Sequence, residues 1–405
     1  EHTVLIKPDG TVFSTGLGDA KCIYWKRNEL TLSMTSIPKL NVMAFKVTSV
    51  ACGANHTLFH LSNLSVLAAG SNSKGQLGLG RSERCTVKIG DSISSPESVP
   101  LQDNLLAAKI YAGAVHSMIL TTEGSVFTFG YNGRGQLGIG SSLDDVDYPS
   151  KVVDLGPKNP SNSSRWLSAL LVQAGRKPAK VRGEKRAAAG ALGDQHSGIL
   201  TDDGKIYMWG SAERGRLGFG ETQGLSVVFR PKLVESLAKY NIIQLSCGRS
   251  HSVAVTDFME VFVWGDGVLA PLGFAERKIQ WFPRELKSLI GAEVVKVECG
   301  EAHSIALTSA GRVMTWGVGK YGRCGMDEGD EQDIIKPRVV DSLLGKRIIH
   351  IAAGRDFSFC VDSEGAYYSF GHGYYGTLGS GLNSDEHVAK EIDVQDWVQY
   401  SQKLC

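Results

Sequence analysis

Short apolar stretches recur along the whole chain, and turns rich in glycine separate them. Residues 117–121 (SMILT), for example, are followed by the turn at 122–125 (TEGS) and by a second apolar stretch at 126–129 (VFTF). Stretches of this length bounded by turn residues predict β-strands, because a buried helix needs a longer apolar period. The pattern therefore indicates many short strands joined by tight turns.

The stretches form one unit that returns seven times. A unit has a strand, the motif G-x-x-H, a second strand, a glycine turn, a third strand ending in glycine, a glycine-rich link and a fourth strand; we call these strands A to D. The motif anchors are spaced by 54, 60, 80, 55, 52 and 54 residues, and they are His2, His56, His116, His196, His251, His303 and Phe357. The first unit lacks its strand A.

A four-stranded unit cannot bury its own two faces, whereas seven units stacked radially share a core. The sequence therefore predicts an all-β fold, a single seven-bladed β-propeller over residues 1–405. The tail at 396–405 (DWVQYSQKLC) is expected to supply the missing strand A and to close the first blade. Either Gln402 or Cys405 fits the position that Cys52 occupies in the second unit.

Composition agrees with this organisation. Glycine accounts for 48 of the 405 residues, about 12% against a usual background of roughly 7%. The 43 basic and 42 acidic residues nearly balance, which excludes binding to nucleic acid by net charge alone. No apolar run is long enough to cross a membrane. The eight cysteines form no C-x-x-C pair, so we expect a reducing compartment, cytoplasmic or nuclear. Because the sequence begins at Glu1, we expect a piece of a longer chain.

Strings that imitate nucleotide-binding motifs lie in the links between strands C and D. The segments 317–322 and 371–376 match G-x-G-x-x-G, and residues 70–75 have the spacing of a P-loop with Gln76 where lysine should stand. No helical pattern follows them, so they indicate turn geometry. A histidine repeated in six of the seven units is typical of a structural group that bonds backbone atoms between blades. We therefore expect no cofactor, metal, small-molecule substrate or covalent chemistry.

The motif G-x-x-H-(T/S), combined with G-Q-L-G-x-G, resembles the regulator of chromosome condensation repeat family, whose fold is a seven-bladed propeller. Members of this family that activate the GTPase Ran contact it through the links between strands A and B. The resemblance therefore implies a partner-binding set, which consists of Asp194, His196, Arg249, His251, Glu301, His303 and Asp356. Loops on a rigid scaffold are the usual place for such sites.

The resemblance also has a limit. The Ran exchange factor carries an extra β-wedge in a link between strands C and D, with an F-R-D-like signature. The corresponding segments here, 130–140 (GYNGRGQLGIG) and 210–220 (GSAERGRLGFG), contain neither. We therefore predict a propeller for protein interaction, as a scaffold or regulatory domain, with a small GTPase as one partner class. A guanine nucleotide exchange factor for a Ran-like GTPase is the alternative, and a chromatin-associated regulator is the third hypothesis.

The spacing of 80 residues marks a basic insertion over residues 156–186. It carries a candidate docking loop formed by Arg176, Lys177, Lys180 and Arg182. A tolerated surface insertion is one interpretation, and a docking segment or nuclear import signal is the other. Because it joins strand D to the next strand A, we expect it on the face opposite the G-x-x-H links.

Overall fold

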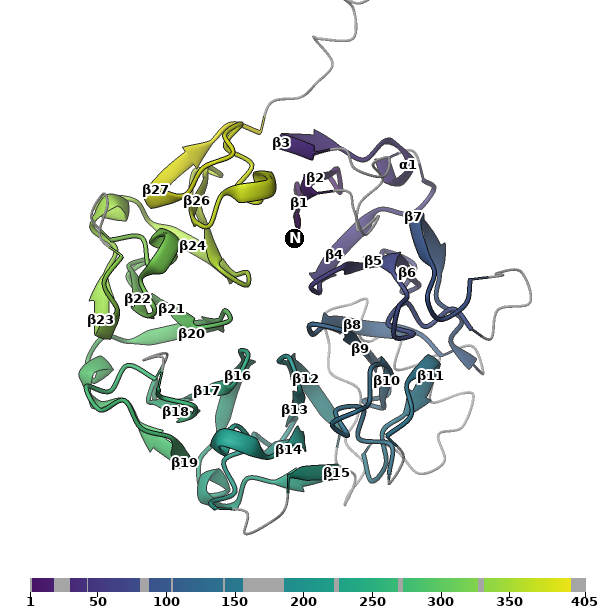
Figure 1. The fold of residues 1–405 in the computed structure, drawn as a ribbon, viewed down its shortest axis with the longest axis horizontal. Coiled ribbons are helices and arrows are strands. Elements are labelled where there is room, and N and C mark those ends of the chain that lie inside the picture. The colour runs from purple at the N-terminus through teal and green to yellow at the C-terminus, as the bar shows by residue number, and fades with distance from the viewer. Residues whose placement is uncertain are drawn as a thin grey trace, which may run out of the picture.

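The computed structural model is a ring of seven β-sheets arranged as blades around a central channel (Figure 1). It describes residues 2–17, 30–41, 43–80, 87–102, 105–140, 143–155, 186–221, 226–268, 272–326 and 331–394. The predicted seven-bladed propeller is therefore confirmed. Within the described residues, blade 1 has three strands (β1–β3), and blades 2 to 7 have four each, from β4–β7 to β24–β27.

All strands within a blade pair antiparallel, and strand A lies innermost. The A strands are β4 (Val47–Cys52), β8 (Ala107–Ala112), β12 (Ala187–Leu192), β16 (Ile242–Cys247), β20 (Val294–Cys299) and β24 (Ile348–Ala353). The B strands are β1 (His2–Ile6), β5 (His56–Leu61), β9 (His116–Thr121), β13 (His196–Thr201), β17 (His251–Thr256), β21 (His303–Thr308) and β25 (Phe357–Asp362). Each B strand thus begins at the anchor residue of its unit.

The C strands are β2 (Val12–Leu17), β6 (Val66–Ser71), β10 (Val126–Gly130), β14 (Ile206–Ser211), β18 (Val261–Gly265), β22 (Val313–Gly317) and β26 (Tyr367–Gly371). The outermost D strands are β3 (Leu30–Ser36), β7 (Ser92–Ser98), β11 (Val146–Lys151), β15 (Val227–Leu233), β19 (Gln280–Glu285), β23 (Ile334–Val339) and β27 (Glu386–Ile392). The helices are single turns: α1 (Pro38–Asn41) and the 3₁₀ turns η2 (Glu213–Gly215), η3 (Glu235–Leu237), η4 (Lys287–Leu289), η5 (Lys320–Gly322), η6 (Asp341–Leu343) and η7 (Tyr374–Gly376).

The core lies between neighbouring blades. The aromatic residue near the end of strand C packs against the preceding blade, as Trp209 does against Met118 and Leu120 of blade 3. Trp209 is fully buried, and its indole N–H donates to the Gln136 carbonyl at 2.8 Å. A Cβ on Gly138 would lie 2.6 Å from the indole nitrogen. This close approach explains the last glycine of the G-Q-L-G motif, because the indole of the next blade occupies the space that a side chain there would need.

Every inner strand of blades 2 to 7 contains a bulge at its second residue. In blade 5, for example, Ile242 pairs with Thr256 and Gln244 pairs with Val255, so Ile243 has no partner across the ladder. The bulged residues are Thr48, Ala108, Ala188, Ile243, Val295 and Ile349. Since a bulge adds one residue to one strand only, it turns that side chain out of the ladder.

Prolines mark the outer edge of the ring. At one register position, strand D carries Pro96, Pro149, Pro231, Pro283 and Pro337 in blades 2 to 6. A proline has no N–H to offer, so it blocks pairing with another strand. Blade 7 has Ala389 at this position, and its N–H donates to the Ser342 hydroxyl at 3.1 Å.

Blades 7 and 1 meet through different contacts from the other blades. Phe357 and Phe359 pack with Phe13 and Met34 in one apolar cluster. The Thr3 hydroxyl donates to the Thr377 carbonyl at 2.7 Å. The closing strand predicted at 396–405 lies outside the described residues, and so does the insertion at 156–185 with Arg176, Lys177, Lys180 and Arg182.

Candidate functional site

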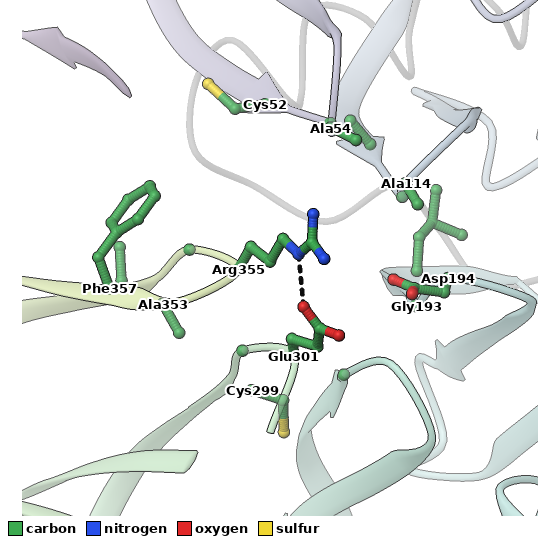
Figure 2. A pocket seen from close by; sticks show the side chains of 18 of the residues that line it. Cys52, Ala54, Ala114, Gly193, Asp194, Cys299, Glu301, Ala353, Arg355 and Phe357 are labelled. Carbon is green, nitrogen blue, oxygen red and sulfur yellow. Dashed lines mark hydrogen bonds and ion pairs between the residues drawn. The ribbon is translucent and has the colours of Figure 1, made fainter. Parts of the chain in front are cut away.

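The links between strands A and B surround one mouth of the channel. Together with the ends of the inner strands they line a cavity of about 670 Å³ (Figure 2). In blades 2 to 7 the carbonyl of the residue before the anchor accepts a bond from the residue that follows the strand C glycine, as Gln195 does from the Ser211 N–H at 2.8 Å. The link between strands A and B and the end of strand C therefore lie on the same face.

Behind this mouth lies a layer of six histidines, which we call the histidine layer: His2, His56, His116, His196, His251 and His303. Each Nε2 reaches a hydroxyl of the next blade, as in His56 to Ser117 (2.9 Å) and His196 to Ser252 (3.0 Å). The Ser117 hydroxyl in turn donates to the Gln76 carbonyl at 2.8 Å. Because a hydroxyl has one hydrogen, Nε2 must carry the proton and donate it. The layer thus joins each of these blades to the next through a side-chain hydroxyl, and not through the backbone groups expected from the sequence.

The glycine of the G-x-x-H motif makes room for the imidazole ring of its own unit. A Cβ on Gly193 would lie 2.3 Å from the Gly248 carbonyl oxygen and 2.5 Å from Cε1 of His196. Burial lowers the pKa of His116 and His303 to about 3 and that of His251 to about 4. Burial also lowers the pKa of His196 well below its ordinary value. The rings are therefore neutral at physiological pH.

This burial corrects one part of the site implied by the family resemblance. His196, His251 and His303 have no exposed surface. Their rings are bonded to Ser252, Ser304 and Ser358 of the following blade. These three side chains hold blades together and cannot touch a docked partner in this structure.

Charged residues of four consecutive blades meet at the mouth, and we call them the charged arc: Asp194, Arg249, Glu301 and Arg355. Arg249 Nε lies 3.9 Å from an Asp194 oxygen, and its Nη1 pairs with Glu301. Arg355 pairs with the other oxygen of Glu301. Figure 2 shows Arg355 extending from blade 7 toward the middle of the cavity. The arc is thus a continuous chain of alternating charges across blades 4 to 7.

The members of the arc differ in exposure. The Arg249 and Arg355 side chains are 53% and 58% exposed, whereas the Glu301 carboxylate between them is 14% exposed. Burial disfavours ionisation of Glu301, but Arg355 and Arg249 outweigh it and lower its pKa. Burial and the nearby Glu301 carboxylate raise the pKa of Asp194. Two guanidinium groups are therefore presented to solvent on a half-buried carboxylate whose ionised form they favour.

Asp356 does not line the cavity, although the sequence placed it in the same set, and it meets the arc only through Arg355, whose Nε lies 3.6 Å from one of its oxygens. It is 9% exposed, and its carboxylate pairs with the buried Arg323 of blade 6 at 2.7 Å. Asp356 is therefore a contact between blades. Arg355, which the candidate set omitted, occupies the cavity instead.

A simple positional rule separates these two residues. The first variable residue of each G-x-x-H lines the cavity, and these residues are Ala54, Ala114, Asp194, Arg249, Glu301 and Arg355. Of the second variable residues, only Asn55 is part of the lining. Choosing the first position in every unit would have found Arg355. On the side of blades 2 and 3, Cys52, Ala54 and Ala114 leave the wall small and uncharged (Figure 2).

Comparison with known proteins gives one consistent family. The model of the RCC1-like domain matches residues 155–403, more than half of the chain. The model of the regulator of chromosome condensation (RCC1) repeat matches residues 47–76 and 107–136. Among curated proteins, the chain is 32% identical over 377 residues to the human E3 ubiquitin-protein ligase HERC2, covering 92% of this chain and 7% of that protein. It is 27% identical over 361 residues to the ultraviolet-B receptor UVR8 of Arabidopsis thaliana, covering 89% of this chain and 73% of that protein.

Solved structures agree on the fold. Human WBSCR16 superimposes with a TM-score of 0.76 at 20% identity and covers 95% of this chain and 94% of its own. Prp20p from Saccharomyces cerevisiae, described with its binding to Gsp1p and histones, superimposes with a TM-score of 0.75 at 18% identity and covers 96% of this chain and 87% of its own. No helix in the described part of the chain is long and apolar enough to cross a membrane.

Proposed function

The chain belongs to the family of RCC1-like domains, and from this premise we propose that it binds a protein partner at the charged arc. The observation that supports this function is the first variable position of the G-x-x-H motif. It is Ala in blades 2 and 3 and a charged residue in blades 4 to 7, while the flanking Gly and His remain the same through blade 6. The scaffold does not need those charges, since blades 2 and 3 form without them.

The geometry favours recognition of a partner with charges of both signs. Arg249 and Arg355 are exposed on one side of the cavity, and arginine is enriched among residues that dominate binding energy. Their pairing with Glu301 fixes the guanidinium planes before a partner arrives, which reduces the entropy lost on binding. Asp194, at the end of the arc, offers a carboxylate to a cationic group. The small wall at Ala54 and Ala114 leaves room for an inserted side chain.

Exchange activity toward a small GTPase is the second candidate. The solved structure of Prp20p, whose description names binding to Gsp1p, supports it through the shared fold. The absence of a wedge insertion from the sequences at 130–140 and 210–220 disfavours it. An exchange factor would act by competing for the phosphate and magnesium region of the GTPase, without forming bonds itself. Direct chromatin binding is a third candidate, which the balanced charge of the chain disfavours.

Affinity capture with matched variants tests the proposed site. Arg249→Gln and Arg355→Gln should each reduce capture of partners by tenfold or more, about the effect of losing one central contact. Arg284→Gln is the control, because Arg284 is 46% exposed and paired with Glu276 on the outer edge of blade 5. The proposal is wrong if both arc variants capture the same partners as the wild type. Release of a fluorescent guanine nucleotide from a panel of small GTPases then separates exchange activity from simple docking.

A further inference from the structure

We propose that two copies of this chain associate through the face opposite the charged arc. Exposed apolar side chains gather there on blades 5 to 7, and we call them the apolar crescent: Ile243, Phe258, Met259, Ile290, Val295, Leu344 and Ile349. This surface is separate from the proposed partner site, and self-association through it does not depend on the function proposed for that site.

The crescent arises from two repeated features of the blades. The bulge of the inner strand turns out Ile243, Val295 and Ile349, which are 48%, 39% and 45% exposed. At the same position blades 2 to 4 carry Thr48, Ala108 and Ala188. Exposing a large apolar side chain at a bulge is unfavourable, because water must hydrate its surface. Nothing in the pairing of the strands requires such a residue at this position. Three consecutive blades therefore differ from the others at a position that the fold leaves free.

The turns beside these bulges add to the same surface. Ile290 and Leu344 follow η4 and η6, in the links from strand D to the next strand A, and are 68% and 58% exposed. Phe258, in the turn between β17 and β18, is 83% exposed. In the propeller these two kinds of link share one face, opposite the G-x-x-H links.

The inner strands of the three blades are held side by side at this level. The Gln244 amide donates to the Val297 carbonyl at 2.7 Å and joins blade 5 to blade 6. Lys296 Nζ donates to the Ile351 carbonyl at 2.7 Å and joins blade 6 to blade 7. Because Gln244 and Lys296 directly follow Ile243 and Val295, the bulged side chains lie on adjacent strands that are fixed to each other. The part of the crescent formed by the bulged residues is thus held in place by contacts between blades.

Its size matches one side of a stable protein interface. The fractional exposures together equal nearly four complete residues, on the order of 600 Å² if each aliphatic residue offers no more than the smallest area of an aromatic side chain, about 150 Å². A standard interface removes about 800 Å² from each partner, and the largest apolar patch of a typical monomer covers about 300–600 Å². An apolar surface of this extent is expected to be covered in solution.

The distribution of charge favours a second copy as the occupant. The crescent itself carries no charge, so two crescents meet without burying an ion. Exposed residues of both signs lie within three positions of its members in the chain: Asp257 and Glu293 are acidic, and Lys287, Lys346 and Arg347 are basic. Such a rim can pair with itself across a two-fold axis, which is the commonest symmetry of protein dimers. The charged arcs would then face outward at the two ends of the dimer.

Analytical ultracentrifugation of the whole chain over a wide range of concentration tests this proposal. The wild type should be in equilibrium between monomer and dimer. Ile290→Asp and Leu344→Asp should each weaken dimerisation by roughly 30-fold or more, the factor that corresponds to one lost interfacial hot spot. The matched control is Phe282→Asp, since Phe282 is 57% exposed on the outer strand β19 and should leave the dimer intact.

Mixing variants of opposite charge sharpens the test. An equimolar mixture of Leu344→Asp and Leu344→Lys should associate more strongly than either variant alone, because the charges then face each other across the interface. The proposal is overturned if the wild type stays monomeric at every concentration, or if the two Asp variants dimerise like the control. It is also overturned if deletion of residues 157–185 from a monomeric chain increases binding of a hydrophobic dye, because that segment would then be the occupant.

Discussion

The histidine layer and the charged arc come from the same tetrapeptides, yet they occupy opposite environments. The histidine rings are buried and bonded to the next blade, while the Arg249 and Arg355 side chains are more than half exposed at the mouth of the cavity. The position that repeats holds the ring together, and the position that varies is free to carry recognition. In a repeat protein, residues that recur in the units therefore maintain the fold, and residues that vary between units are the candidates for function.

Acid should reveal the largest difference between the two regions, because it lowers folding stability through the histidine layer before it affects the charged arc. The histidines have an ordinary pKa of 6.5, lowered by burial to about 3 for His116 and His303 and to about 4 for His56. Between the lowered and the ordinary pKa, the histidines of the unfolded chain bind protons that those of the folded chain do not. Their contribution to the free energy of unfolding is therefore full above pH 6.5 and decreases as the pH falls. The loss at pH 5 is on the order of 2 kcal/mol per ring.

Thermal unfolding followed by circular dichroism from pH 7.5 to 5 measures this effect. The Glu301 carboxylate contributes in a lower range, because its lowered pKa gives stability that is lost only below its ordinary value of 4.5. A midpoint that stays constant down to pH 5 would show that the rings do not remain neutral and buried.

Removing one ring should have the next largest effect. His251→Ala loses the bond to Ser304 and leaves a cavity between blades 5 and 6, which should lower the free energy of unfolding by about 2–4 kcal/mol. Phe357→His tests the converse. Thr3 holds the position of the bonding serines at the junction of blades 7 and 1, so this variant should lose only about 1 kcal/mol. Denaturant titration gives the free energy of unfolding of both variants. Equal losses would contradict the conclusion that the bond between an anchor histidine and the hydroxyl of the next blade stabilises the ring.

The charged arc should contribute little to stability. Arg249→Gln and Asp194→Asn remove exposed or half-buried charges and should change the free energy of unfolding by no more than about 0.5 kcal/mol each. Asp356→Asn is the contrasting variant, since Asp356 pairs with the buried Arg323, and it should destabilise more. Melting temperatures of the three variants provide the comparison, which fails if the arc variants unfold as readily as Asp356→Asn.

The smallest effect is expected at the outer edge of the ring. Ala389→Pro removes the N–H that bonds Ser342 but restores the residue of five other blades at this position. A proline also reduces the entropy of the unfolded chain by about as much as one exposed bond contributes, so the net change should lie within about 0.5 kcal/mol. A larger loss in a denaturant titration would mean that the blade 7 edge depends on Ser342.

The sequence by itself determined the number of units and the start of every strand B. These features repeat with a fixed period, and a period is visible without coordinates. The sequence also located the links that we propose for recognition. The family resemblance selected Asp356 and omitted its neighbour Arg355, although the first variable position of each motif would have identified Arg355.

Only the tertiary structure decided that Arg355 enters the cavity while Asp356 turns to Arg323 of blade 6. It also decided that each histidine bonds a hydroxyl of the next blade, and that the bulged residues of blades 5 to 7 are exposed on neighbouring inner strands. The physical reason is the same in each case. The partners are more than 30 residues apart in the chain and come together only when the blades stack, so no local pattern in the sequence can specify which atoms meet.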